Sequence, residues 1–133
     1  MDDSRSISAR PKGLQHDFAA AVAFYPACRQ PLEYRAGWKT KVPLLILIGE
    51  KDDWTPAEPC IDLAARAAAR GDAVTIQVYA HAYHDFDAPS AKLRVRKNIA
   101  TTASGTATTG TEPAARADAI ERTPAFFARY LRP

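Results

Sequence analysis

Apolar residues in the first part of the chain gather in three short runs, each about as long as a β-strand. Residues 42–48 are apolar throughout, which favours a strand covered on both faces of a sheet. Residues 18–25 are also apolar throughout and stop at Pro26; we interpret them as a buried strand, with a helix as the alternative because of their alanines. Residues 74–79 alternate between apolar and polar side chains, which predicts a third strand nearer the edge of the sheet.

A helix is predicted between the second and third runs. Thr55, Pro56 and Glu58 have the pattern of a capping box with a proline at the first helical position. The alanine-rich residues 60–70 continue the helix, and Gly71 ends it. The face expected to pack on the sheet consists of Ile61, Ala64, Ala65 and Ala68.

A second helix is predicted over residues 114–131, after a start at Glu112 and Pro113. Pro124 lies inside this helix and is expected to bend it or split it. Residues 88–111, which precede it, are rich in Ser, Thr and Gly and are predicted to form a long irregular loop. The apolar face of the helix is predicted to consist of Ala117, Ile120, Phe127 and Leu131, flanked by Phe126 and Tyr130.

These elements predict one α/β domain. Residues 42–79 form a strand–helix–strand unit, for which a parallel crossover is expected. We expect residues 1–17 to be an irregular lead-in and residues 18–133 to form the domain. The length of 133 residues, with 47% hydrophobic and 25% charged residues, suits a single globular domain.

Carboxylates and histidines follow two of the predicted strands. Asp52 and Asp53 come directly after the second strand, and residues 81–85, which include His81, His84 and Asp85, follow the third. The carboxyl ends of parallel strands meet at one edge of a sheet, so an Asp–His pair is expected there. A carboxylate that orients an imidazole supplies two of the three members of a Ser–His–Asp or Cys–His–Asp triad.

Around these residues the chain resembles the C-terminal part of the dienelactone hydrolase family, within the α/β-hydrolase superfamily. The resemblance spans most of residues 17–132 and implies the C-terminal portion of a three-layer sandwich, with about three parallel strands, flanking helices and the N-terminal half missing. Its specificity comes mainly from the second and third of five segments: FAAAVAFYPAC at 18–28, PLLILIGEKDDWTP at 43–56, VYAHAYHDFDAP at 78–89, RVR at 94–96, and the helix at 114–131.

The resemblance also implies an activity and two site residues. It assigns Asp52 as the acid and His84 as the base of a catalytic triad that acts on small carboxylic esters or lactones, with no cofactor and no metal. The family carries its nucleophile on a G-x-C-x-G or G-x-S-x-G elbow, and neither motif occurs in this sequence. We therefore expect the chain to be inactive alone. The alternative is a non-enzymatic α/β module that dimerises or binds a partner.

Several other functions for these residues remain open at the level of sequence. Cys28 follows a strand, as a nucleophile should, but has no flanking glycines, so a small loop residue is the favoured interpretation. Asp53 suits a solvated or capping carboxylate, and Trp54 a wall of the site. A metal site at His81, His84 and Asp85 is disfavoured because no third well-spaced ligand is evident. Nucleic-acid binding by the basic residues Lys92, Arg94, Arg96 and Lys97 is disfavoured, since no aromatic residues are interleaved.

Charge and cysteine content bear on location and partners. The net charge of +3 is mildly basic, and no apolar run approaches the ~20 residues of a membrane helix, so no membrane is expected. Cys28 and Cys60 show no disulfide framework, and Cys60 is expected in the core. No segment resembles a signal peptide. The absence of a disulfide framework and of a signal peptide predicts a cytoplasmic location. The α/β-hydrolase topology that the resemblance implies would leave the strand at 18–25 without its neighbour on one side, which predicts self-association through that edge or poor solubility.

Overall fold

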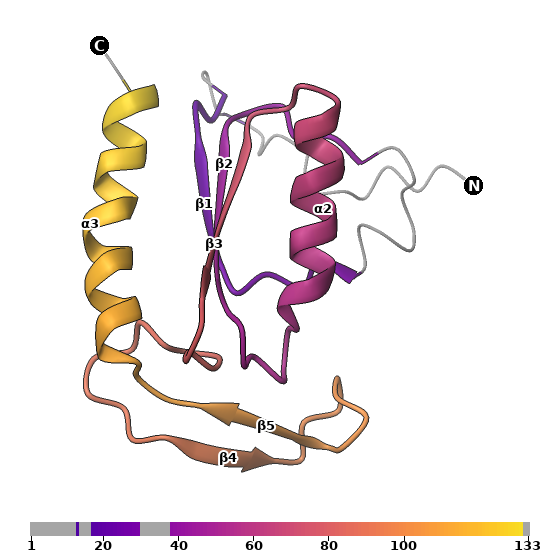
Figure 1. Cartoon of the computed structure of the whole chain (residues 1–133), viewed down its shortest axis with the longest axis vertical. Coiled ribbons are helices and arrows are strands. Elements are labelled where there is room, and N and C mark those ends of the chain that lie inside the picture. Colours follow the sequence, from indigo (N-terminus) through magenta and orange to yellow (C-terminus); the bar gives the residue numbers. More distant parts are fainter. Residues whose placement is uncertain (1–12, 14–16, 30–37, 132–133) are drawn as a thin grey trace.

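A parallel sheet forms the centre of the fold in the computed structural model, which describes residues 13, 17–29 and 38–131 (Figure 1). Its strands are β1 (Ala21–Phe24), β2 (Leu44–Gly49) and β3 (Val74–Tyr79), in the order β1-β2-β3. The register pairs Ala21 with Leu44, and Leu44 with Val74, so all three strands point the same way. Residues 45–49 of the central strand are buried, as an unbroken apolar run predicts.

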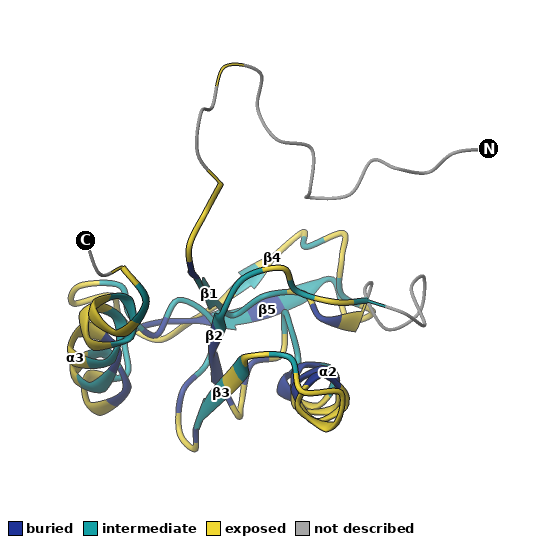
Figure 2. Cartoon of the chain, turned by 90° about the horizontal axis from the view of Figure 1, so that it is seen from above, coloured by how far each residue is buried: buried dark blue, intermediate teal, exposed yellow. Residues whose placement is uncertain are grey.

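Two helices cover opposite faces of this sheet, which gives three layers (Figures 1 and 2). On one face, α3 (Pro113–Tyr130) packs through Ala115 and Ala119 against a cluster that includes Leu45, Leu47 and Phe86. On the other face, α2 (Ala57–Ala69) packs through Ala57, Cys60 and Leu63 against Ile46 and Ile48. The predicted architecture of three parallel strands between helices is confirmed.

The face that α2 turns toward the sheet differs from the predicted one. Ala64 is buried as predicted, but Ile61 is 45% exposed and Ala65 and Ala68 are also exposed. The buried stripe instead includes Cys60, which is fully buried. Alanine occurs all round this helix, so the sequence pattern did not fix its rotation. The buried residues of the stripe are Ala57, Cys60, Leu63, Ala64 and Ala67.

The prediction of the apolar face of α3 is also wrong. Ile120 and Leu131 are 53% and 52% exposed, whereas the small residues Ala115 and Ala119 are buried. This face of the helix also carries Asp118, whose carboxylate accepts a 2.7 Å hydrogen bond from the Tyr79 hydroxyl at the end of β3. The helix is not split at Pro124 and continues as one element to Tyr130.

The stretch predicted as an irregular loop contains a β-hairpin. Strands β4 (Arg94–Lys97) and β5 (Thr106–Thr109) pair in antiparallel register and lie beyond the carboxyl ends of the three parallel strands (Figure 1). The carboxylate of Asp53 anchors the hairpin by accepting hydrogen bonds from the amide and the hydroxyl of Thr108, at 2.7 and 2.8 Å. Polar contacts of this kind leave no hydrophobic periodicity in the sequence, so the pattern did not reveal the hairpin.

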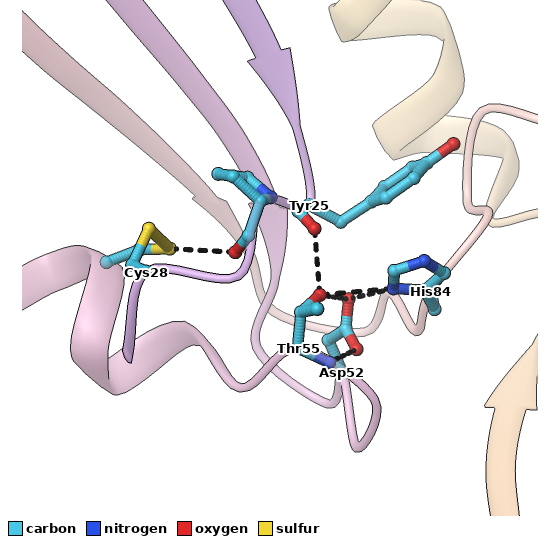
Figure 3. Close-up of a disulfide and its surroundings, with 7 residues drawn as sticks. Tyr25, Cys28, Asp52, Thr55 and His84 are labelled. Atoms are coloured by element: carbon cyan, nitrogen blue, oxygen red, sulfur yellow. Dashed lines mark hydrogen bonds and ion pairs between the residues drawn. A yellow bond between two sulfur atoms is a disulfide. The ribbon is translucent and has the colours of Figure 1, made fainter. Parts of the chain in front are cut away.

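Cys28 and Cys60 form a disulfide, which corrects the prediction that the chain has none. The bond joins the segment after β1 to the first turn of α2, across a separation of 32 residues (Figure 3). Cys28 is 3% exposed and Cys60 is fully buried. Disulfides persist in oxidising compartments and are rare in the cytoplasm. The cysteines therefore no longer support the predicted cytoplasmic location.

Within the described ranges, no helix combines the length and the apolarity that crossing a bilayer requires.

Candidate active site

The loop after β2 buries a carboxylate. Asp52 is 4% exposed, and its Oδ1 accepts hydrogen bonds from the amides of Trp54 and Thr55, at 2.9 and 2.8 Å. An aspartate can bond backbone amides two and three residues further along the chain in this way, and the resulting turn fixes the side chain. Its second oxygen, Oδ2, is left to face the neighbouring loop.

A close approach of two backbones brings the loop after β3 to this carboxylate. A Cβ added at Gly49 would lie 2.2 Å from the carbonyl oxygen of Ala82, so only glycine fits at the end of β2. The contact lets the Lys51 amide donate to the Ala82 carbonyl at 3.0 Å. Two residues further along, the carbonyl of His84 accepts a 3.1 Å hydrogen bond from the Gly110 amide. The backbone on each side of the imidazole is thus held.

The two predicted site residues meet at this edge of the sheet. Nδ1 of His84 lies 2.8 Å from Oδ2 of Asp52, and the side chains are 12% and 0% exposed (Figure 3). A carboxylate accepts but cannot donate, so Nδ1–H is the donor and the neutral imidazole carries its lone pair on Nε2. This arrangement prepares Nε2 to accept a proton, the role of the base in a triad.

Aromatic rings pack against the imidazole. The ring centroids of Tyr25 and Trp54 lie 4.2 and 4.7 Å from that of His84. Burial raises the pKa of the Tyr25 hydroxyl well above its ordinary value, and the carboxylate of Asp87, which accepts a 3.1 Å hydrogen bond from it, adds to this effect. The ring therefore stays neutral at physiological pH. Trp54 also donates from Nε1 to the hydroxyl of Thr101 at 3.0 Å, which ties the site to the hairpin turn.

The other candidates from the sequence lie elsewhere or have different partners. His81 is exposed, and Asp53 is the anchor of the hairpin. Cys28 is joined to Cys60, so it offers no free thiol as a nucleophile. Thr55 does not cap α2, because Pro56 is the N-cap residue and no side chain bonds to the free amides there. Among the residues that the structure describes, no group of three or more His, Cys, Asp or Glu side chains is placed to hold a metal.

Sequence analysis missed two residues of the site. Tyr25 was read only as the end of a strand, and Thr55 only as a helix cap, yet the Thr55 hydroxyl donates to the Tyr25 carbonyl at 2.8 Å and lies 3.1 Å from Oδ2 of Asp52. The signal that could have found Tyr25 was its position: it directly follows a parallel strand, at the same edge of the sheet as Asp52 and His84.

A parallel sheet between helices, with an Asp–His pair beyond the carboxyl ends of its strands, is the arrangement of a partial α/β-hydrolase fold. Comparison with known families agrees with this class. The sequence profile of the dienelactone hydrolase family matches residues 9–131, and the chain belongs to that family. No curated protein matches the chain. No solved structure matches it either.

Proposed function

We propose that this chain supplies the acid and the base of a dienelactone hydrolase-type enzyme that cleaves small carboxylic esters or lactones. The observation that carries the proposal is the buried 2.8 Å contact between Nδ1 of His84 and Oδ2 of Asp52. Family membership supports the hydrolase class. The pair also lies where parallel α/β sheets bind their ligands, beyond the carboxyl ends of the strands.

The roles of the two side chains follow from their hydrogen bond. Nε2 of His84 would take the proton of a thiol or hydroxyl nucleophile as it attacks the ester carbonyl, and would then return the proton to the leaving alcohol. Asp52 would hold the imidazole in the required tautomer and stabilise the imidazolium that forms. The nucleophile itself must come from polypeptide outside these 133 residues, because the sequence contains no nucleophile elbow.

The free edge of β1 is where such a polypeptide would join the sheet. Among the described residues β1 pairs only with β2, so one row of its backbone amides and carbonyls has no strand beside it. A parallel strand added there would end next to Tyr25, whose ring contacts His84. A nucleophile at the end of that strand would then lie near the base.

Complementation tests this proposal. The chain would be mixed with a polypeptide that carries the N-terminal half and the nucleophile elbow of a dienelactone hydrolase family member, and hydrolysis of p-nitrophenyl acetate would be followed. We expect negligible turnover from either piece and measurable turnover from the mixture. His84→Ala should then reduce the rate by about 10²–10⁴-fold, the usual contribution of a general base.

Two controls make the result specific. His81→Ala removes an exposed histidine three residues away and should leave the rate of the mixture unchanged. Asp52→Asn should lower the rate by up to about 10⁴-fold, because an amide in place of the carboxylate favours the wrong imidazole tautomer. Turnover in the mixture that survives both His84→Ala and Asp52→Asn would refute the proposed roles.

The same edge strand favours a second, non-enzymatic candidate, in which two copies of the chain associate through β1. Unpaired strand edges recruit other strands, and natural proteins usually cover or shorten them. Exposed apolar side chains at this end of the chain include Phe18, which is 73% exposed. Sedimentation at about 50 µM, where strand-edge association becomes visible, would show a dimer if this candidate is correct. A monomer at that concentration would exclude it.

A further inference from the structure

We propose that the hydroxyl of Thr55 is a positioning residue for the Asp52–His84 pair, which deepens the proposed function and rests on it. The hydroxyl oxygen lies within hydrogen-bonding distance of groups from three separate segments of the chain (Figure 3). It is 2.8 Å from the carbonyl oxygen of Tyr25, 3.1 Å from Oδ2 of Asp52 and 3.2 Å from Nδ1 of His84.

The single proton of the hydroxyl decides how these contacts are used. The Tyr25 carbonyl and the Asp52 carboxylate can only accept, and the carbonyl is the nearer of the two, so we assign the proton to Tyr25. A lone pair of Oγ1 is then free to face Nδ1–H of His84. That N–H would be shared between Asp52 at 2.8 Å and Thr55 at 3.2 Å. Two acceptors on one side of the ring favour the tautomer protonated at Nδ1.

The hydroxyl also fixes the ring that packs on the imidazole. Tyr25 has a backbone φ of 39°, in the left-handed region that tyrosine rarely adopts. Its conformation is held by its amide, which donates to the Leu47 carbonyl at 2.7 Å, and by its carbonyl, which accepts from Thr55. Loss of the Thr55 hydroxyl would therefore leave Nδ1–H of His84 bonded to Asp52 alone, and would loosen the segment that carries the stacked ring.

Helix α2 gives an independent reason to assign this role. A threonine at the N-cap position of a helix caps free amides of the first turn. Here the N-cap residue is Pro56, which makes no side-chain cap, while the adjacent Thr55 turns its hydroxyl to the Asp–His pair instead. The helix start thus lacks a stabilising bond that this residue type could have supplied.

The test compares Thr55→Val, which keeps the shape of the side chain without the hydroxyl, with Thr55→Ser, which keeps the hydroxyl. The ¹⁵N shifts of the His84 ring report its tautomer, and the exchange of Nδ1–H with water reports its hydrogen bonding. Exposed His81 in the same sample is the internal reference. We expect wild type and Thr55→Ser to show the Nδ1–H tautomer with slow exchange. Thr55→Val should keep the Nδ1–H tautomer, because Asp52 still accepts from Nδ1, but its Nδ1–H should exchange about tenfold faster, the factor that one hydrogen bond of ordinary strength provides.

Thr55→Val with the Nδ1–H exchange rate of the wild type would overturn the proposal. If Thr55→Val fails to fold, Thr55→Ala is assessed in the same way. Failure of both to fold, with Thr55→Ser folded, would assign the hydroxyl to stability and also overturn it. The measurement needs no turnover, so it is separable from the proposed function. Faster Nδ1–H exchange in Thr55→Val, without activity in the complemented mixture, would reject the hydrolase and retain the role of Thr55.

Discussion

Reduction of the Cys28–Cys60 disulfide should destabilise the fold more than the loss of any single surface contact. The bond closes a loop across 32 residues and ties the segment that follows β1 to the first turn of α2. Both sulfurs lie in the core between α2 and the sheet, where Cys60 is fully buried. Reduction keeps both cysteine side chains and removes only the covalent bond between them. The resulting loss of unfolding free energy therefore measures the contribution of that bond.

The size of the effect follows from the length of the loop. For a separation of 32 residues, the chain-entropy relation gives about 4 kcal/mol of stabilisation at 25 °C. Single domains are stable by only about 5–15 kcal/mol, so the reduced chain would keep a small margin. For a chain of this size, the loss corresponds to a fall in Tm of roughly 15 °C.

The assay is urea unfolding, followed by circular dichroism, of the oxidised chain and of the same chain in dithiothreitol. The double variant Cys28→Ala/Cys60→Ala is the matched control, because reductant should not change its midpoint. Thiol titration of the unfolded protein without reductant should find no free thiol. Two free thiols, or equal midpoints for the oxidised and reduced chain, would refute the reasoning.

Two further predictions concern contacts that hold the strand ends. Gly49→Ala places a Cβ 2.2 Å from the backbone oxygen of Ala82, so we expect a loss of about 1–3 kcal/mol in urea unfolding; a change below about 0.5 kcal/mol would contradict the close approach. A hydrogen bond from Arg122, with a second from Tyr79, holds the pKa of Asp118 below its ordinary value of 3.8. The ionised carboxylate therefore stabilises the fold above about pH 4, and this contribution is lost as the pH falls further. The difference in unfolding free energy between wild type and Arg122→Leu should shrink below that pH, and a difference that is constant from pH 7 to pH 3 would disprove the linkage.

The elements that sequence analysis predicted well are those fixed by local hydrophobic pattern. The unbroken apolar run before Gly49 favoured a strand covered on both faces, and that strand is the centre of the sheet. Parallel neighbours then had to deliver their following loops to one edge, which is why Asp52 and His84 could be predicted to meet. The topology predicted an Asp–His pair at this edge, and the resemblance to the dienelactone hydrolase family selected Asp52 and His84 as its members.

The features that were missed depend on contacts between distant residues. Nothing in the spacing of Cys28 and Cys60 indicates that the segment after β1 lies against the first turn of α2. The hairpin is held to the sheet end by Asp53, through bonds to a residue 55 positions away. The rotation of both helices was ambiguous because alanines occupy several faces and bury too little area to distinguish them. Such features appear only when the tertiary fold brings the partners together.

The contacts of the Asp52–His84 pair show that the acid and the base are positioned independently of the nucleophile. Every hydrogen bond described for these two side chains comes from the loop after β2, through Trp54 and Thr55, or from the pair itself. The backbone of His84 is fixed by Gly110, after β5. None of these contacts crosses the free edge of β1. The geometry of acid and base should therefore persist whether or not a further strand joins there, whereas alignment of a nucleophile would depend wholly on that edge. A loss of activity caused by mutations in β1, with the His84 tautomer unchanged, is the pattern that this division requires.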